Sequence, residues 1–283
     1  MSGATSGGAG DFLAGMAAAS RARSAAAQAE LPARELLARV KELPPAPALK
    51  LSSFDLIAEV KLRSPAVGLL KAAADEDVGE RVATYARAGA AAVSILTEPS
   101  RFDGSLDDLE RGARSLHPLA VPAMRKDFLV DGYQVIEGRA AGAGGVLAIL
   151  RMIPRADLEE LIDTALQLEM FVLLEAFDEP DIALAHELLD ARRAHHDLLL
   201  VGVNSRDLTT LKVVPGRLDA LGDKLPRSVK RVAESGVATA EDAARMARHG
   251  YDLALVGSAL MSAPDPAALA RDMLSAARKA KNP

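Results

Sequence analysis

The sequence contains no cysteine and no tryptophan, and aromatic residues make up only 3% of its 283 residues. Without cysteine the chain has no disulfide framework, no thiolate metal site and no cysteine nucleophile. The scarcity of aromatic rings argues against base-stacking platforms and against the aromatic belts of membrane proteins. The core must therefore be built mainly from Ala, Val, Leu and Ile.

Long apolar runs and an excess of positive charge are also missing. The chain has 34 basic and 39 acidic residues and a net charge of −5, so no nucleic-acid partner is expected. No stretch reaches the ~20 uninterrupted apolar residues of a membrane span. The longest candidate, residues 140–150, is glycine-rich and is followed by Arg151. Residues 1–10 lack the positive charge of a secretory signal, so we expect no membrane partner and a cytoplasmic location.

What the sequence does contain is a regular alternation of two patterns. Short apolar runs recur at roughly 25–35 residues, about the length of one βα unit. These predicted strands are 56–60, 91–96, 121–124, 145–149, 171–174, 198–203, 232–233 and 253–256. Segments with helical periodicity lie between them, at 80–88, 106–116, 157–168, 182–189 and 240–247. Three helix-to-strand joins contain Gly89, Gly142 and Gly250, which suit the left-handed position after a helix.

This alternation predicts an α/β fold, either a doubly wound sheet or a closed (β/α)8 TIM barrel. A dinucleotide-binding sheet has a glycine-rich fingerprint after its first strand, and residues 61–65 here contain no glycine. The number of strands and the chain length favour the barrel, as a catalytic domain over 51–283. A helical extension at 11–50, broken at Pro32, precedes the barrel, and residues 1–10 are expected to form a flexible tail. Phe12, Leu13 and Met16 form an apolar stripe with which the extension could dock.

Charged and amide residues stand at the ends of five predicted strands. They are Glu59, Lys61, Lys126, Glu175, Asn204, Arg206 and Glu234. One such charge could simply mark the point where a strand reaches solvent, but a balanced set at the barrel mouth predicts a catalytic site. Glu59 and Lys61 share one face of their strand. No carboxylate–histidine pattern on one element supports a metal site, and we expect the histidines, His195 and His196 included, to lie on the surface.

The last two strands end in small residues that suit an anion. Ser235-Gly236 and Gly257-Ser258 expose backbone N–H groups, and Thr239 is the expected N-cap of a helix. Phosphate commonly binds between these two loops of a barrel, although the same residues could serve only to make tight turns. A side chain introduced at Gly257 is expected to block the anion and to leave the lysines untouched.

Seven motifs, spread in order between Asp11 and Met261, resemble those of the indole-3-glycerol-phosphate synthase family of tryptophan biosynthesis. They are 58–61 (Ala-Glu-Val-Lys) with Ser64-Pro65, 102–106 (Phe-Asp-Gly-Ser-Leu), 125–128 (Arg-Lys-Asp-Phe) with Tyr133-Gln134, 173–175 (Leu-Leu-Glu), 202–208 (Gly-Val-Asn-Ser-Arg-Asp-Leu), 233–236 (Ala-Glu-Ser-Gly) and 256–261 (Val-Gly-Ser-Ala-Leu-Met). The N-terminal extension is similar to the lid that covers the barrel mouth in this family.

The resemblance implies a lyase that needs no cofactor and no metal. Its phosphorylated small-molecule substrate would be 1-(2-carboxyphenylamino)-1-deoxyribulose 5-phosphate, which closes a ring and loses CO2 and water to give indole-3-glycerol phosphate. The matching catalytic residues are Glu59, Lys61, Lys126, Glu175 and Asn204. The matching substrate and phosphate contacts are Ser64, Phe102, Phe128, Arg206, Glu234, Ser235, Gly236, Gly257 and Ser258.

Individual roles also follow from the resemblance. Lys126 matches the acid of ring closure, and Glu175 and Glu59 match the groups of dehydration. Lys61 matches a contact to the substrate carboxylate that could itself deliver a proton, so which lysine acts in which step stays open. Asn204 and Arg206 resemble positioning groups, Glu234 a partner of a lysine, and Phe102 and Phe128 the walls around the aromatic ring.

The sequence departs from the family pattern at Ala66, at Ser205 and at Gly144-Gly145, where the family often has Ser, Asn and Asp-Ala. These departures leave room for a duplicated copy that serves a secondary pathway. An aldolase with Lys126 as Schiff-base nucleophile is an alternative enzyme, and a barrel retained only as a binding module is a non-enzymatic one. A phosphoribosylanthranilate isomerase fits less well because it would need a cysteine base. We expect a monomer or a weak homodimer.

Overall fold

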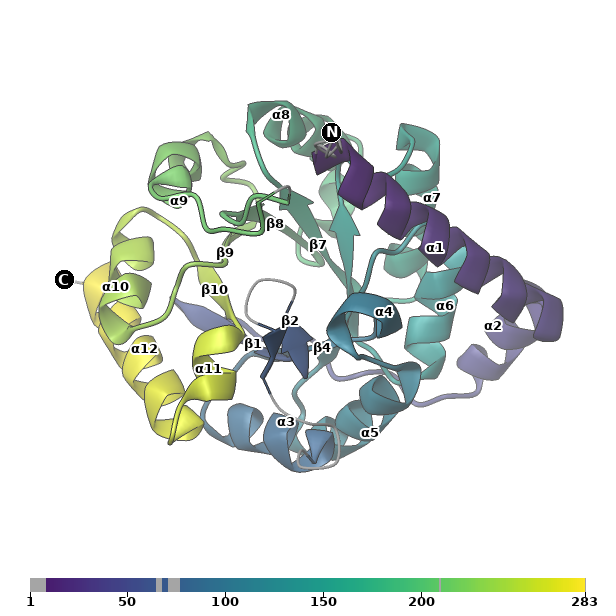
Figure 1. Cartoon of the computed structure of the whole chain (residues 1–283), viewed down its shortest axis with the longest axis horizontal. Coiled ribbons are helices and arrows are strands. Elements are labelled where there is room, and N and C mark those ends of the chain that lie inside the picture. Colours follow the sequence, from purple (N-terminus) through teal and green to yellow (C-terminus); the bar gives the residue numbers. More distant parts are fainter. Residues whose placement is uncertain (1–8, 65–67, 71–76, 209, 283) are drawn as a thin grey trace, which may run out of the picture.

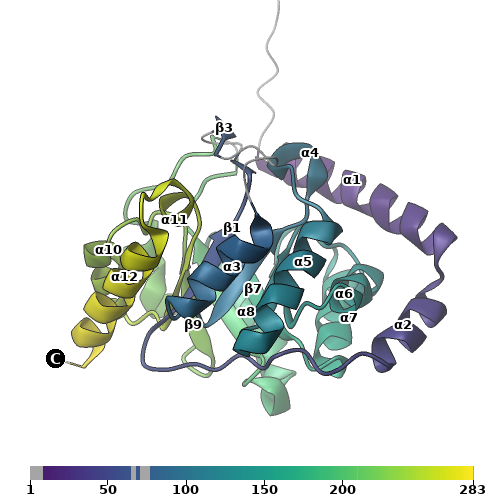
Figure 2. The same cartoon turned by 90° about the horizontal axis from the view of Figure 1, so that it is seen from below.

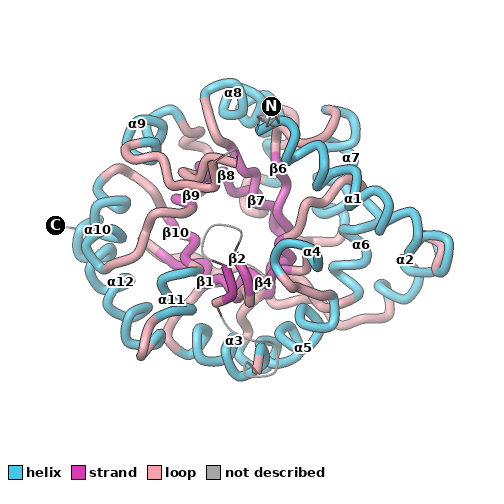
Figure 3. The backbone as a smooth tube through the Cα atoms, viewed as in Figure 1, coloured by secondary structure: helices cyan, strands magenta, loops and turns pink. Residues whose placement is uncertain are grey.

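The computed structural model describes residues 9–64, 68–70, 77–208 and 210–282. Its centre is a closed barrel of parallel strands in which each strand pairs with the next along the chain and β1 pairs with β10 (Figure 3). The barrel strands are β1 (Asp55–Val60), β4 (Ala92–Leu96), β5 (Ala123–Lys126), β6 (Gly145–Ile149), β7 (Phe171–Ala176), β8 (Leu199–Asn204), β9 (Lys230–Glu234) and β10 (Leu253–Val256). The predicted (β/α)8 barrel is confirmed.

A helix follows each barrel strand and packs on the outside of the barrel (Figure 1). These helices are α3 (Val78–Arg87), α5 (Leu106–Leu116), α6 (Gly132–Ala140), α7 (Arg155–Gln167), α8 (Glu179–Asp190), α9 (Arg217–Leu221), α10 (Ala240–Arg248) and α12 (Pro266–Lys281). Shorter elements are α4 (Pro99–Phe102), α11 (Ser258–Ser262), the hairpin strands β2 (Arg63–Ser64) and β3 (Gly68–Leu69), and the 3-10 turns His117–Leu119, Arg193–His195 and Gly222–Lys224.

Each strand divides its side chains between two apolar layers. In β1, Leu56 and Val60 pack against the outer helices, whereas Ile57 points into the barrel interior. Glu59 points inward as well, because side chains alternate along a strand. Both faces of a barrel strand are therefore buried, and this explains why the strands appear as continuous apolar runs in the sequence.

Local signals in the sequence set the helix boundaries. Gly89, Gly142 and Gly250 all have positive φ angles, as the helix-to-strand joins predict. Thr239 is the N-cap of α10, and its hydroxyl oxygen accepts a hydrogen bond from the backbone N–H of Asp242. Helix α6 ends just before Gly142, as that join predicts, but the sequence does not locate its start, because the helix is covered on most sides and so has no polar stripe.

The N-terminal extension consists of α1 (Ala9–Glu30) and α2 (Ala33–Lys41), separated at Pro32 as expected. Residues 9 and 10 of the predicted tail belong to α1, and residues 1–8 lie outside the described part of the chain. Leu13 and Met16 of α1 join the barrel interior from one end, while α2 packs against α6. Figure 2 shows α1 at the same end of the barrel as α4 and β3, with the chain passing from α2 along the opposite end to reach β1.

A tight contact between two strands explains the glycine at position 145. Gly145 of β6 pairs with Phe171 of β7, and a Cβ atom at Gly145 would lie 2.3 Å from Cε1 of the Phe171 ring. The phenyl ring of Phe171 is fully buried in the barrel interior. Glycine at this position therefore accommodates a large aromatic side chain on the neighbouring strand.

We predict that Gly145→Ala lowers the free energy of unfolding by about 1–3 kcal/mol, because it overpacks the barrel interior. Combining it with Phe171→Leu should recover part of this loss, and urea unfolding of the two single variants and the double variant measures the coupling. Gly15→Ala in α1 is the control, since no atom lies within 4 Å of its Cβ position. Additive losses in the double variant would contradict the packing explanation.

Candidate active site

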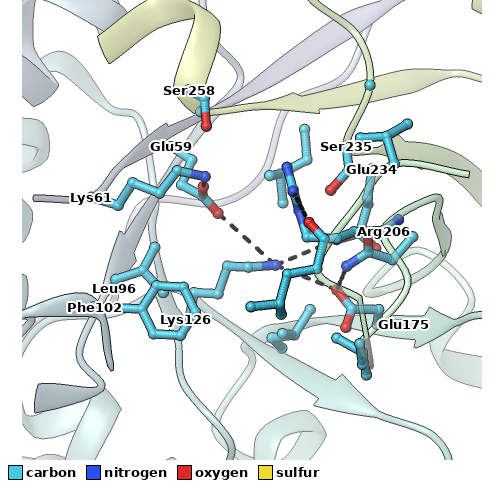
Figure 4. A pocket seen from close by; sticks show the side chains of 18 of the residues that line it. Glu59, Lys61, Leu96, Phe102, Lys126, Glu175, Arg206, Glu234, Ser235 and Ser258 are labelled. Carbon is cyan, nitrogen blue, oxygen red and sulfur yellow. Dashed lines mark hydrogen bonds and ion pairs between the residues drawn. The ribbon is translucent and has the colours of Figure 1, made fainter. Parts of the chain in front are cut away.

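A cavity of about 310 Å³ opens at the carboxyl ends of the barrel strands. Every site residue predicted from the sequence lines it, with the exception of Ser64. Ser64 belongs to β2, and its side chain lies outside the described part of the structure, as does residue Ala66. Figure 4 shows the charged side chains converging on the cavity from several strands. The predicted gathering of these residues at the barrel mouth is thus present in the structure.

Lys126 lies at the centre of a cluster of carboxylates. Its Nζ atom is 3.4 Å from Oε2 of Glu175, 3.4 Å from Oε2 of Glu234 and 4.0 Å from Oε2 of Glu59 (Figure 4). Burial alone lowers the pKa of a lysine, but here the attraction of the three carboxylates outweighs it and raises the pKa of Lys126. The side chain is therefore held as an ammonium, a potential proton donor.

Glu59 and Lys61 form a second ion pair on the last part of β1 and just beyond it. Lys61 Nζ donates to Oε1 of Glu59 at 2.5 Å, which agrees with their predicted placement on one face. Burial raises the pKa of Glu59, but the charges of Lys61 and Lys126 more than offset this, so its pKa lies below the ordinary value. Glu59 is thus a carboxylate shared between two lysines.

Glu175 is oriented by an amide from the neighbouring strand. Asn204 Nδ2 donates to Oε2 of Glu175 at 3.1 Å, while Asn204 Oδ1 accepts from the backbone N–H of Arg206 at 2.9 Å. The Arg206 side chain donates to the backbone oxygen of Leu211 at 2.6 Å. Burial lowers the pKa of Arg206, and the carboxylate of Glu59 acts in the opposite direction. The end of β8 therefore supplies both an anchor for Glu175 and a positive charge.

Glu234 differs from the other acids of the cluster. Its Oε1 atom is buried and has no hydrogen-bond partner among the described residues. The site has room for this side chain because residue 202 is glycine; a Cβ there would lie 2.2 Å from Oε1 of Glu234. Burial raises the pKa of Glu234 well above its ordinary value, and the negative charge of Glu175 adds to this effect. The positive charge of Lys126 acts in the opposite direction but does not offset them. Glu234 is therefore protonated more readily than an ordinary glutamate.

Small residues after β9 and β10 form another wall of the cavity. Ser235 and Gly236 adopt φ angles of 63° and 76°, which turn the chain sharply at the mouth. The hydroxyl oxygen of Ser258 is buried and has no hydrogen-bond partner in the described part of the chain. These loops thus leave polar groups free for a ligand.

The expectation for Gly257 is wrong in one respect. A Cβ atom at Gly257 would lie 2.3 Å from Oε1 of Glu59 and 2.9 Å from Nζ of Lys61. Any side chain at this position would displace the Glu59–Lys61 pair as well as obstruct an anion. Gly257 is needed because the charged pair on β1 approaches its backbone, and a substitution there cannot separate anion binding from the lysines.

The opposite side of the cavity is apolar. The Phe128 ring packs against Phe12 with centroids 5.9 Å apart and against Phe102 at 6.2 Å. The cavity has further apolar lining residues that the sequence did not single out, which are Leu96, Leu147, Ile149, Leu208, Leu211, Val213, Val237 and Leu255. Half of them lie in barrel strands, where inward and outward apolar positions look alike in a sequence, and the other half lie in the loops after β8 and β9.

The cavity lining offers neither histidine nor a metal site among the described residues. No histidine is among the residues that line the cavity, and the described part of the chain contains no group of His, Cys, Asp and Glu side chains that could hold a metal ion. Among the described helices, none combines the length and the apolar character required to cross a bilayer.

The fold and the site together define a (β/α)8-barrel protein with an acid–base cluster at its strand ends. The model of the indole-3-glycerol phosphate synthase family matches residues 16–273. An indole-3-glycerol phosphate synthase of a Nocardioides species is 41% identical over 233 residues, which cover 81% of this chain and 83% of that protein. One from Streptomyces coelicolor is 36% identical over 260 residues and covers 90% and 92%. The chain belongs to the indole-3-glycerol phosphate synthase family.

More distant solved structures share only the fold. A thiamine phosphate pyrophosphorylase from Pyrococcus furiosus superposes with a TM-score of 0.58 at 15% identity, covering 81% of this chain and 97% of that chain. A 3-hexulose-6-phosphate synthase superposes with a TM-score of 0.59 at 17% identity, covering 79% and 99%. These similarities support the barrel architecture and carry no information on the reaction.

We predict that Glu234→Gln makes the protein relatively more stable as the pH rises. A carboxyl group with a raised folded-state pKa stabilises the fold below its ordinary pKa of 4.5, and this contribution is lost as the pH rises through the raised value. Glutamine keeps the shape of the neutral form and cannot ionise. Urea unfolding at a series of pH values above 4.5 should therefore show a growing difference in favour of the variant.

Glu110→Gln is the matched control for this series, because Glu110 lies on the exposed face of α5 in an ion pair with Arg114. The unfolding free energy of this variant should follow that of the wild type at every pH. A constant difference between Glu234→Gln and the wild type over the whole series would contradict a raised pKa of Glu234 in that pH range.

Proposed function

We propose that this chain is a carbon–carbon lyase that converts 1-(2-carboxyphenylamino)-1-deoxyribulose 5-phosphate into indole-3-glycerol phosphate, CO2 and water, without a cofactor. The observation that carries this proposal is the buried ammonium of Lys126, which three carboxylates surround in a cavity with one apolar and one polar wall. Relatives named for this synthase activity support the same reaction.

The two walls of the cavity suit the two ends of such a substrate. The phosphate lies at the loops after β9 and β10, where backbone N–H groups of Gly236 and the hydroxyl groups of Ser235 and Ser258 are available. The carboxyphenyl ring lies against Phe102 and Phe128. In this orientation the reacting ketone faces the charged cluster.

Ring closure requires an acid at the ketone oxygen. The aromatic carbon that bears the carboxylate attacks the ketone carbon, and the electron pair of the carbonyl bond moves onto oxygen, which takes a proton from Lys126. Loss of CO2 then returns the bonding electrons to the ring. Lys61, paired with Glu59 at 2.5 Å, contacts the substrate carboxylate until it leaves as CO2.

Dehydration follows at the same centre and requires an acid and a base. The hydroxyl group formed from the ketone leaves as water after protonation, and a carboxylate takes the proton that is lost as the indole forms. Glu175, oriented by Asn204 at 3.1 Å, and Glu59 are the groups placed for these transfers. Arg206 lies beside them as a fixed positive charge for the sugar chain.

The electrostatics of Lys126 disfavour a Schiff-base aldolase. A lysine nucleophile must be a free amine, which enzymes obtain by lowering its pKa through burial or a neighbouring cation. Here three carboxylates raise the pKa of Lys126 and keep it protonated. The cluster therefore keeps Lys126 protonated, a form that carries a proton to donate and has no lone pair with which to attack a carbonyl carbon.

We predict that Lys126→Ala folds normally and loses at least about 10²–10⁴-fold in turnover, since it removes the general acid. The appearance of indole fluorescence from the proposed substrate measures the rate. The exposed Lys279→Ala on α12 is the control and should retain wild-type activity. Product formation by a folded Lys126→Ala variant at the wild-type rate would exclude the mechanism, and borohydride trapping of a substrate adduct on Lys126 would favour the aldolase.

The phosphate assignment predicts that Ser258→Ala weakens binding without slowing the chemistry. Losing one hydrogen bond to a charged group costs about 1.5–3 kcal/mol, so KM should rise by roughly tenfold or more while kcat changes little. Inorganic phosphate, used as a competitive inhibitor, should bind more weakly by a similar factor. Ser262→Ala on the exposed end of α11 is the control. Unchanged inhibition by phosphate would place the anion elsewhere.

A further inference from the structure

The motif Arg-Lys-Asp-Phe at 125–128 contains two charged residues that the proposed reaction does not use. Asp127 lies between the catalytic Lys126 and the aromatic wall residue Phe128, and its side chain is fully buried. Its partner comes from the N-terminal extension, because Arg23 Nη2 of α1 donates to Asp127 Oδ1 at 2.8 Å. An ion pair therefore links α1 directly to the end of β5.

Asp127 in turn connects the segment after the catalytic lysine with Thr97, which follows the neighbouring strand β4. Its Oδ1 atom accepts from the backbone N–H of Phe128 at 2.8 Å, and its Oδ2 atom accepts from Oγ1 of Thr97 at 2.8 Å. The backbone N–H of Thr97 donates to the backbone oxygen of Lys126 at 3.0 Å. The carboxylate thus ties together the ends of β4 and β5, next to Lys126.

Arg23 also reaches a second buried carboxylate. Its Nη1 atom lies 3.8 Å from Oε1 of Glu98, whose side chain has no exposed area. Glu98 is the N-cap of α4 and accepts hydrogen bonds from the backbone N–H groups of Ser100 and Arg101 at 2.9 and 2.6 Å. Because α4 ends at Phe102, Glu98 sets the position of the other aromatic wall.

Arg23 compensates the charge of both buried carboxylates, Asp127 and Glu98. Arg125 lies 3.6 Å from Asp127, but it is also paired with Glu137 at 2.8 Å. Within the described residues, Arg23 is the cation that pairs with Glu98. Removing Arg23 would leave Glu98 without its cation and Asp127 with Arg125, which Glu137 shares. A buried charge without compensation forces its surroundings to rearrange.

We propose that Arg23 is a positioning residue of this enzyme, which holds the ends of β4 and β5 in register and so places Lys126, Phe102 and Phe128 for the reaction. This inference rests on the proposed function and deepens it. It gives the expected lid a specific part in the chemistry, since α1 completes an ion-pair cluster that supports the catalytic strand end.

Other contacts hold α1 on the barrel independently of Arg23. Ser24 Oγ donates to Asp131 Oδ2 at 2.6 Å, and Gln134 Nε2 donates to Ser20 Oγ at 2.9 Å. Leu13 and Met16 are buried in the barrel interior. A variant that lacks only the guanidinium group should therefore keep α1 in place, which separates positioning from docking.

The test compares Arg23→Met with Arg23→Lys and with the control Arg21→Met. Arg21 lies on the same helix and forms an exposed ion pair with Asp157, with 3.4 Å between Nη2 and Oδ2. We expect Arg23→Met to lower kcat by about 10- to 100-fold, since misplacement of a catalytic group by 1 Å can cost up to about 10²-fold. Arg23→Lys should recover part of kcat, and Arg21→Met should match the wild type.

Two binding probes separate positioning from a general loss of structure. Anthranilate, an aromatic carboxylate, should bind Arg23→Met more weakly, because it depends on the walls formed by Phe102 and Phe128. Inorganic phosphate, which is assigned to the loops after β9 and β10, should bind as it does to the wild type. Adding Glu98→Gln to Arg23→Met should restore part of anthranilate binding, because it removes one of the uncompensated charges.

Each outcome of these measurements decides the proposal. Wild-type kcat and anthranilate binding in Arg23→Met would overturn it. An equal loss of anthranilate and phosphate binding together with a lower Tm would also overturn it, in favour of a purely structural role. If the wild type fails to convert the proposed substrate, the proposed function fails, and the split between the two binding probes still decides whether Arg23 positions the aromatic wall. If Arg23→Met does not fold, the same comparison is made with Arg23→Lys and the double variant.

Discussion

An ammonium group buried among three carboxylates is the interaction on which this structure depends. Lys126 extends from β5 towards Glu59 of β1, Glu175 of β7 and Glu234 of β9. Opposite charges this close favour the charged forms of Lys126 and of Glu59, despite their burial. The surrounding structure is arranged to make this possible. Glycine at 202 provides the space for Glu234, and glycine at 257 provides the space for the Glu59–Lys61 pair.

Much of this arrangement follows from the sequence because of the geometry of parallel barrels. The carboxyl ends of all the strands meet at one mouth, so a polar residue such as Glu175 at the end of an apolar run is placed as soon as the run is recognised as a strand. Close contacts between side chains and the backbone of a neighbouring strand do not follow in this way. The approach of Glu59 to the backbone of Gly257 joins residues far apart in the chain, and no local pattern reports it. The start of helix α6 was not located for a related reason, since α2 covers the face that would otherwise carry a polar stripe.

Two of the positions that depart from the family pattern, Gly145 and Ser205, are each accommodated by a neighbouring residue. Glycine at 145 coincides with the Phe171 ring on the adjacent strand, so the volume removed at one position is filled from the other. Ser205 retains a structural hydrogen bond, because its hydroxyl group donates to the backbone oxygen of Ser235 at 3.0 Å. Both changes preserve the shape of the barrel interior or the mouth and leave the charged cluster intact. They are adjustments of packing and support around an unchanged set of ionic groups.

The pairing of β1 with β10 has a consequence for how the protein folds. The first barrel strand is synthesised early and its partner last, so Asp55 meets Leu253 only after nearly the whole chain is available. Because Glu59 and Lys61 follow on that strand and Ser258 follows β10, the mouth can be complete only after this longest-range pairing has formed. Contacts of such high sequence separation are slow to form. Catalytic competence should therefore appear as a late event in refolding, after most helices have formed, and could serve as a signal for barrel closure.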